Sequence, residues 1–357
     1  MKTKLNRKIF LETLDKVKPG LSNQAIVEQS STFVFKGNRV YTFNDEISVE
    51  APIEVNLPEC AVPAEELYKL IERMQTEELE LEFTNEELII KANRMSAGIR
   101  IEKTITLPVE EIQQEEKVMS LPGGFFDGLR YCIPCVSKNQ NNPVLTCVNI
   151  SQTGLIESCD NFRLMRYKTD MEKKKKLDPF LLPASSAKQL LNYETLKKYG
   201  ITPDRNWIRF STEEKNDFII SCRTYQNMNY PDLDDIMKRV LKENQELIKF
   251  PKNMENIIER VSVFLSTDPL DEVIEVHLKE DLIEMEGKGQ SGWCKEHCRI
   301  EYKSSPISFL INPRNFKEIL KQMTEGTVGD NTIHFRSERL DHVIWINRVD
   351  KKNAKNY

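Results

Sequence analysis

The chain of 357 residues lacks any long hydrophobic run. No stretch approaches the roughly 18–20 apolar residues that a membrane-spanning helix needs. The basic segment 1–17 also lacks the apolar core and the small-residue cleavage site of a secretory signal. These absences argue against a helical membrane protein and against a secreted one. Charged residues make up 30% of the sequence, which predicts a soluble protein with a solvated surface.

The sequence is also poor in the residues of catalytic centres. It has only four histidines, His277, His297, His334 and His342, and each lies in strand-like alternation with no nucleophile motif beside it. The segment GKGQSG, residues 287–292, matches the glycine spacing of a dinucleotide-binding loop. The residues after it alternate like a strand instead of opening a helix, which favours a glycine-rich β turn. We therefore predict no enzymatic activity and no cofactor.

Cysteines are present, but their pattern does not indicate disulfides. Eight are spread along the chain, several within apolar strand or helix patterns, as is typical of buried thiols in a reducing, cytoplasmic compartment. Cys132 and Cys135 form a CxxC pair, and Cys294, His297 and Cys298 form a second cluster. Neither has a partner pair at zinc-finger spacing, so structural thiols are favoured and no metal site is predicted.

Three segments share a layout of an apolar residue, a proline and an amphipathic helix. Their prolines are Pro63, Pro183 and Pro313, at intervals of 120 and 130 residues. Proline suits the first turn of a helix because its missing N–H would have no partner there. The apolar residues that follow recur at the three- and four-residue spacing of a helix packed on one face.

A second set of predicted helices precedes the first. These helices begin near Asn6, Pro122 and Pro251, at intervals of 116 and 129 residues, and the segments between them alternate like short strands. Both intervals are close to a third of the chain. We therefore predict three copies of a unit that contains two helices and roughly eight strands.

The predicted fold class is α+β, with the two helices of each unit packed on antiparallel sheets. Charge-rich segments at 110–117 and 238–247 are interpreted as boundaries, and the lysine run 173–176 as a solvated loop. The predicted domains are residues 1–115, 116–240 and 241–357.

Basic residues recur on or near the predicted helices. About six such units closed into a ring, helices inward, would place these cations around a hole and bind duplex DNA without reading its sequence. The net charge of −5 still permits a basic surface on one face with an acidic exterior. The alternative is that these side chains are only the polar faces of surface helices. The candidate DNA-binding residues are Lys18, Lys69, Arg73, Lys138, Lys188, Lys197, Lys198, Lys317 and Lys321.

Four segments resemble, in order, elements of the bacterial DNA sliding clamps, the β subunits of replicative DNA polymerases. CDNFRL (159–164) resembles the family's Thr-Asp-Gly-His-Arg-Leu element, and NYPDLDDI (229–236) resembles the Phe-Pro-Asp-Tyr segment that closes the middle domain. FLINPRNFKEIL (309–320) resembles a third-domain strand-to-helix junction, and VIWINRV (343–349) resembles the C-terminal apolar strand. The resemblance covers nearly the whole chain and implies a ring-forming clamp fold of three domains.

The resemblance also implies a hydrophobic groove between the second and third domains, where polymerases, the clamp loader and repair proteins insert a short linear motif. Apolar walls would accept leucine and phenylalanine anchors, and Arg163, which is expected to point out of its strand, or Arg348 would meet polar or acidic groups of the peptide. The alternative is that the apolar members are only core strand residues. Carried over residue by residue, the groove would be Leu145, Cys159, Asn161, Phe162, Arg163, Leu164, Pro231, Ile236, Val343, Trp345 and Arg348.

The sequence departs from the family pattern at two places. Asn161 and Phe162 stand where the family has Gly-His, which makes the groove more aromatic and removes a titratable group, although asparagine still tolerates a left-handed turn. The chain also continues for nine residues beyond Arg348, where family members stop almost at once. This tail either occupies part of the groove or frays. The departures suggest a divergent, phage-encoded clamp.

The resemblance finally implies a head-to-tail homodimer in which the first domain of one copy meets the third domain of the next. Phe264 and Leu265 match apolar contact positions on one side, and Ile101 and Ile105 are the candidates on the other. The expected partners are duplex DNA, a DNA polymerase and a clamp-loader ATPase, at the nucleoid in the cytoplasm and without a membrane. The alternatives are a metal-binding Cys/His enzyme and a monomeric β-rich scaffold protein.

Overall fold

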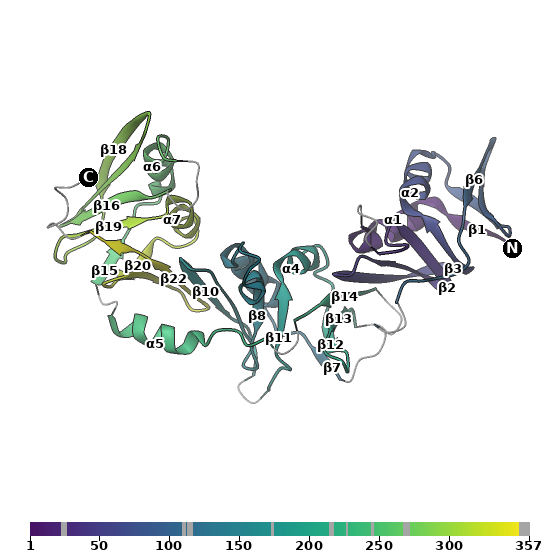
Figure 1. Cartoon of the computed structure of the whole chain (residues 1–357), viewed down its shortest axis with the longest axis horizontal. Coiled ribbons are helices and arrows are strands. Elements are labelled where there is room, and N and C mark those ends of the chain that lie inside the picture. Colours follow the sequence, from purple (N-terminus) through teal and green to yellow (C-terminus); the bar gives the residue numbers. More distant parts are fainter. Residues whose placement is uncertain are drawn as a thin grey trace. The chain divides into compact units, whose positions relative to one another are not determined.

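The computed structural model describes residues 1–22, 27–108, 112, 117–172, 175–213, 218–225, 228–243, 246–266 and 272–349. The chain forms two compact units, Met1–Phe126 with Phe180–Met228 and Asp127–Pro179 with Asn229–Tyr357. We call them unit one and unit two and describe each by itself. The described residues contain seven α-helices and 23 strands (Figure 1), which confirms the predicted α+β class.

Unit one contains two antiparallel sheets and three helices. The helices are α1 (Arg7–Val17), α2 (Ala64–Arg73) and α4 (Ala184–Leu190), which follows β11 (Phe180–Pro183). One sheet has the order β1 (Lys2–Asn6), β4 (Glu78–Phe83), β5 (Glu87–Ala92) and β6 (Met95–Arg100). The other has the order β2 (Thr32–Phe43), β3 (Ile47–Pro63), β14 (Ile219–Arg223), β13 (Trp207–Ser211), β12 (Lys198–Ile201) and β7 (Val118–Ser120).

Unit two contains two further sheets and the remaining helices. The helices are α3 (Phe125–Cys132), which starts at the end of unit one, α5 (Leu233–Glu243), α6 (Met254–Val261) and α7 (Pro313–Leu320). The larger sheet runs through β8 (Cys147–Ile150), β9 (Leu155–Cys159), β10 (Arg163–Lys168), β22 (Leu340–Trp345), β21 (Thr332–Arg336), β20 (Glu325–Val328) and β15 (Glu246–Lys249). The smaller sheet runs through β18 (Gly292–Arg299), β17 (Leu282–Gly289), β16 (Ile274–Lys279), β19 (Ile307–Ile311) and β23 (Asn347–Arg348).

All six predicted helices are present, and local chemistry sets their first turns. The Asn6 side chain accepts hydrogen bonds from the Lys8 and Ile9 amides at 2.9 and 3.1 Å, which caps α1. Pro313 opens α7, as predicted. Pro63 and Pro183 instead occupy the position just before their helices, with extended ψ angles of 120° and 137°, because each is also the last residue of a strand. The predicted first-turn position is therefore wrong for these two prolines.

Helix α5 is a feature that the sequence analysis missed. Segment 238–247 is predicted to be a charge-rich boundary, yet Leu233, Met237 and Val240 are buried at helical spacing on one face of α5. Charged residues cover only its other faces, so a high charge content does not mark a linker. The other predicted boundary, 110–117, lies mostly outside the described residues, as do half of the lysine run 173–176 and the C-terminal tail 350–357.

The two units group the chain differently from the three predicted repeats. Within unit one, β3 pairs with β14, and within unit two, β10 pairs with β22. Each of these sheets therefore joins strands that lie on opposite sides of a predicted boundary. Contacts are dense across such sheets, so the compact units follow the sheets and not the repeat period. The three-domain division stays a prediction.

The glycine-rich segment 287–292 is a β turn, as predicted. It joins β17 and β18. Its glycines, which lack a side chain, leave room for the backbone at the end of helix α6. A Cβ atom on Gly287 would lie 1.8 Å from the Val261 carbonyl oxygen, and one on Gly289 would lie 1.6 Å from the Phe264 carbonyl oxygen. Figure 1 shows α6 beside these strands. The glycines therefore serve close packing and have no nucleotide-loop geometry.

Candidate functional site

One face of the larger sheet in unit two carries a small apolar cluster apart from the main core. Its buried members come from β9, β10, β22 and α5, and half-buried side chains border it, so apolar surface reaches solvent at its edge. We call this set the α5 cluster. Its buried members are Cys159, Leu164, Leu233, Met237, Val240 and Val343, and its border consists of Leu145, Tyr230, Ile236 and Trp345.

Strand register explains why distant segments meet here. Leu164 of β10 lies opposite Cys159 of β9 and opposite Val343 of β22, so the three side chains share one face of the sheet. Helix α5 lays its buried stripe on that face. The structure thus brings together six of the predicted groove residues: Leu145, Cys159, Leu164, Ile236, Val343 and Trp345. Their role in binding stays a prediction.

The remaining predicted groove residues are more exposed. Phe162 lies in the loop between β9 and β10 with 48% of its surface accessible, and its carbonyl oxygen accepts a 2.8 Å hydrogen bond from the Trp345 amide. Asn161 and Pro231 are also exposed. The loop that carries this accessible aromatic side chain is thus bonded through its backbone to Trp345 at the border of the cluster.

The side chain of Arg163 does not point outward, contrary to what the sequence analysis predicted. The predicted outward-pointing cation is buried, with 7% of its surface accessible, because strand alternation turns it to the face opposite Leu164. Its guanidinium already has three acceptors: Asp160 Oδ2 at 3.4 Å, a Glu318 carboxylate oxygen and the Pro134 carbonyl oxygen. Arg163 is therefore not free to receive a peptide from solvent.

Arg348 lies in β23 of the smaller sheet, opposite Phe309. Its Nε and Nη2 atoms donate to the carbonyl oxygens of Asp330 and Gly329 at 2.6 and 2.8 Å. The side chain is half-buried and held against that turn. The structure therefore gives Arg348 an anchoring contact, and its place in the groove stays a prediction.

Tyr230 is a border residue that the sequence analysis missed. Its hydroxyl accepts the Cys159 amide proton at 2.9 Å and lies 3.5 Å from the Cys159 sulfur, to which it donates. Burial raises the pKa of Tyr230, so the hydroxyl keeps the proton that it donates. A signal for this residue exists in the sequence, since an aromatic side chain directly precedes Pro231 in the segment that resembles the clamp family.

An ionic contact holds the start of α5. Arg166, on the same face as Leu164, pairs with Glu157 of β9 at 2.6 Å and with Asp234 of α5 at 2.9 Å. Burial raises the pKa of Glu157 in spite of the arginine. These ion pairs fix the first turn of α5 next to the cluster.

The predicted DNA-binding cations lie mostly on the surface. Arg73, Lys138, Lys188, Lys197 and Lys321 are exposed. Four others have partners. Lys18 lies 3.6 Å above the Tyr68 ring and 3.4 Å from Asp15; Lys69 pairs with Glu65, Lys317 with Glu259 at 3.1 Å, and Lys198 donates to the Glu213 carbonyl at 3.1 Å.

Two helix pairs carry several of these cations. Helices α1 and α2 contact each other in unit one, and α6 and α7 contact each other in unit two. A cavity of about 640 Å³ lies between Lys18 and Lys69. Acidic neighbours weaken the positive field at Lys18, Lys69 and Lys317, so the exposed cations Arg73 and Lys321 are the better candidates for phosphate contacts.

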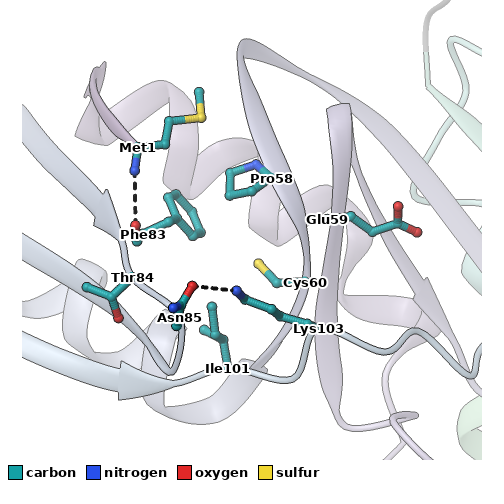
Figure 2. Close-up of a pocket in the computed structure, with 9 residues that line it drawn as sticks. All are labelled: Met1, Pro58, Glu59, Cys60, Phe83, Thr84, Asn85, Ile101 and Lys103. Carbon is teal, nitrogen blue, oxygen red and sulfur yellow. Dashed lines mark hydrogen bonds between the residues drawn. The ribbon is translucent and has the colours of Figure 1, made fainter.

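The predicted interface residues lie in different units. Ile101, in unit one, lines a pocket of about 480 Å³ with Met1, Phe83 and Lys103 (Figure 2). The Met1 amine donates to the Phe83 carbonyl at 3.0 Å. Ile105 is half-buried against a nearby apolar cluster. Their contact with another copy stays a prediction.

On the other side, Phe264 and Leu265 follow α6 in unit two and are half-buried. The Phe264 ring lies over Gly292, where an added Cβ would be 2.9 Å from it. Leu265 packs against the main core of the unit. Both side chains thus keep some surface accessible next to the edge strand β18.

The cysteines of the two predicted clusters are free thiols, buried at Cys132 and Cys135 and half-buried at Cys294 and Cys298. Burial raises the pKa of Cys132 well above its ordinary value and that of Cys135 to about 12, so both stay protonated. Cys294 and Cys298 pack against the main core of unit two from the edge strand β18, where His297 points to the other face. Among the described residues, no three His, Cys, Asp or Glu side chains converge on a possible metal position.

Comparison with known proteins gives matches in structure alone. No protein-family model and no curated protein matches the chain. Solved structures match over 98% of this chain and 100% of theirs. They include the DNA polymerase III subunit beta of Pseudomonas aeruginosa (14% identity, TM-score 0.85), the DNA polymerase sliding clamp of Bacillus subtilis (17%, 0.82) and a P. aeruginosa sliding clamp bound to griselimycin (15%, 0.82).

At these identities the likeness is one of fold. Over 98% of its length, the chain has the fold of the DNA polymerase III β subunits. No helix within the described residues is long and apolar enough to cross a membrane.

Proposed function

We propose that this protein is a DNA sliding clamp, a ring around duplex DNA that tethers a polymerase without catalysing a reaction itself. The observation that carries the proposal is the match of fold over the full length of solved clamps. A tether acts through effective concentration, because a polymerase that releases the DNA rebinds before it diffuses away. The ring needs no sequence-specific contact for this task.

In this proposal, two copies join head to tail, and each contributes three domains near residues 1–115, 116–240 and 241–357. The interface would use Ile101 and Ile105 of one copy against Phe264 and Leu265 of the next. Their accessible apolar surface supports this assignment. The helix pairs would face the DNA, with Arg73, Lys188 and Lys321 among the phosphate contacts.

The surface that binds partners would be the border of the α5 cluster. A polymerase or a clamp-loader ATPase would insert apolar anchors between Tyr230, Ile236 and Trp345, over Leu164 and Val343. The half-buried state of the border residues supports this, since an accessible apolar edge next to a packed cluster suits an inserted peptide. We also propose a cytoplasmic, nucleoid-associated location and a phage origin.

Retention on circular DNA tests the function. The protein, loaded with a clamp loader onto a nicked circle, should stay bound in salt of about 1 M and leave when the circle is cut. A topological link does not depend on ion pairs, whereas electrostatic binding falls steeply with salt on both forms. Equal loss from circular and linear DNA at high salt would contradict the proposal. A stable monomer by sedimentation would favour the scaffold alternative.

A further inference from the structure

We infer that Arg163 is a positioning residue that fixes the loop Asp160–Phe162 to helix α7, and that partner binding at the α5 cluster depends on this connection. The inference rests on the proposed function, because the loop borders the surface proposed to bind partners. It differs from the role that the resemblance to the clamp family implies, in which Arg163 would contact the peptide itself.

The loop is built around Asp160. One of its carboxylate oxygens accepts the amide protons of Phe162 and Arg163, at 2.7 and 2.9 Å. The Asp160 amide in turn donates to the Arg163 carbonyl at 3.0 Å. These bonds set the shape of the turn, but they do not attach it to any other element.

Arg163 supplies that attachment. Its guanidinium donates to Asp160 in the loop, to the Pro134 carbonyl in the 3-10 turn Ile133–Cys135, and to Glu318 of α7. A planar guanidinium serves three acceptors in fixed directions, whereas the ammonium of lysine is a point charge without that geometry. Because the arginine is buried, each acceptor takes the place of water that would otherwise solvate the cation.

The loop then determines the border of the α5 cluster. The Phe162 carbonyl accepts the Trp345 amide proton at 2.8 Å, so the exposed phenylalanine and the border tryptophan are joined through their backbones. Leu164, the next residue along β10, is fully buried in the cluster. A loop released from α7 would move Phe162 and loosen Trp345 while the cluster itself stays packed.

The ion pair between Arg163 and Glu318 also connects the loop to a helix that carries proposed DNA contacts. Glu318 lies between Lys317 and Lys321 near the end of α7, and Lys317 also pairs with Glu259 of α6 at 3.1 Å. Arg163 therefore joins the partner-binding surface on one face of the sheet to helix α7 on the other. No other hydrogen bond or ion pair described for the loop reaches α7.

Calorimetric titration with griselimycin, which one of the similar clamps binds, tests the inference. We expect Arg163→Gln and Glu318→Gln each to weaken binding about five- to tenfold, and the double variant to bind no more weakly than either, because all three break one connection. Arg163→Lys should restore part of the affinity. Arg339→Gln, which removes an ion pair with Asp170 elsewhere in unit two, should bind as the wild type does.

A weakening confined to Arg163→Gln, with Glu318→Gln unchanged, would overturn the inference, because the connection to α7 would then not contribute to binding. Additive effects in the double variant would also overturn it. Glu318→Gln guards against unfolding, since Glu318 is partly exposed and its amide keeps the shape of the carboxylate.

Amide hydrogen exchange without ligand separates this inference from the proposed function. The Trp345 amide should exchange faster in Arg163→Gln and in Glu318→Gln than in the wild type, and unchanged exchange would overturn the inference. If the wild type does not bind griselimycin and the exchange still rises in both variants, the partner surface is wrong and the positioning role stands.

Discussion

Acid should destabilise unit two through His342. This side chain is 1% exposed on the inner face of β22, with Nε2 at 3.9 Å from the Cys135 sulfur and no hydrogen-bond partner for Nδ1 among the described residues. Burial, aided by the nearby Arg163 and His334, lowers the pKa of His342 from 6.5 to about 3. The folded state therefore holds the imidazole neutral at every pH where the protein is handled.

The sign and size of the effect follow from linkage. The unfolded chain takes up a proton at His342 near pH 6.5 and the folded chain only near pH 3, so stability is complete above 6.5 and falls as the pH drops through this window. At about pH 5 the stability falls by about 2 kcal/mol, and at about pH 4 by about 3 kcal/mol. The value near pH 5 hardly depends on the folded pKa, because that pKa lies far below it.

Urea unfolding at about pH 7.5 and about pH 5 measures this effect in the wild type and in His342→Gln. The glutamine variant is expected to start less stable, because the site is tightly packed, but its stability should fall by about 2 kcal/mol less on acidification. Parallel pH profiles of the two proteins would refute the reasoning. A proton NMR titration of His342 gives a second check, since a midpoint near the ordinary histidine pKa in the folded protein would show that the ring is not held neutral.

Three further predictions concern packing, assembly and DNA. Met237→Ala, which removes a buried side chain of the α5 cluster, should cost about 2–4 kcal/mol in urea unfolding, and the exposed Met228→Ala should cost almost nothing; equal costs would contradict the packing of α5. Phe264→Ala with Leu265→Ala should shift the protein toward monomer in sedimentation, and an unchanged mass would refute the interface. Lys321→Ala should lower the salt slope of DNA binding by about one, because it removes one cation that neutralises a phosphate, and an unaltered slope would exclude Lys321 from the DNA surface.

Helices with a cap and a clear apolar stripe were predictable from sequence. Asn6 and Asn312 cap α1 and α7 through bonds to residues only two or three positions away, so the signal and the contact lie in the same short segment. Helix α5 shows the limit. Its stripe is present in the sequence at Leu233, Met237 and Val240, but the charged residues on its other faces outweigh the stripe when composition alone is considered.

The α5 cluster was partly predictable. Leu164, Val343 and Trp345 were found through the resemblance to the clamp family, which implied them as groove residues. Tyr230 was missed because its contact is with Cys159, more than seventy positions away in the sequence. No local pattern encodes that hydroxyl-to-amide bond.

The sequence by itself determined the α+β class, six helices and the apolar side chains that would have to be buried, because propensity, capping and periodicity act over a few neighbouring residues. Only the tertiary structure decided which residues from distant segments they contact. Arg163 is the plainest case: its charge and its strand were evident, but its direction depends on strand register, and its partners Glu318 and Pro134 come from segments that only folding brings together.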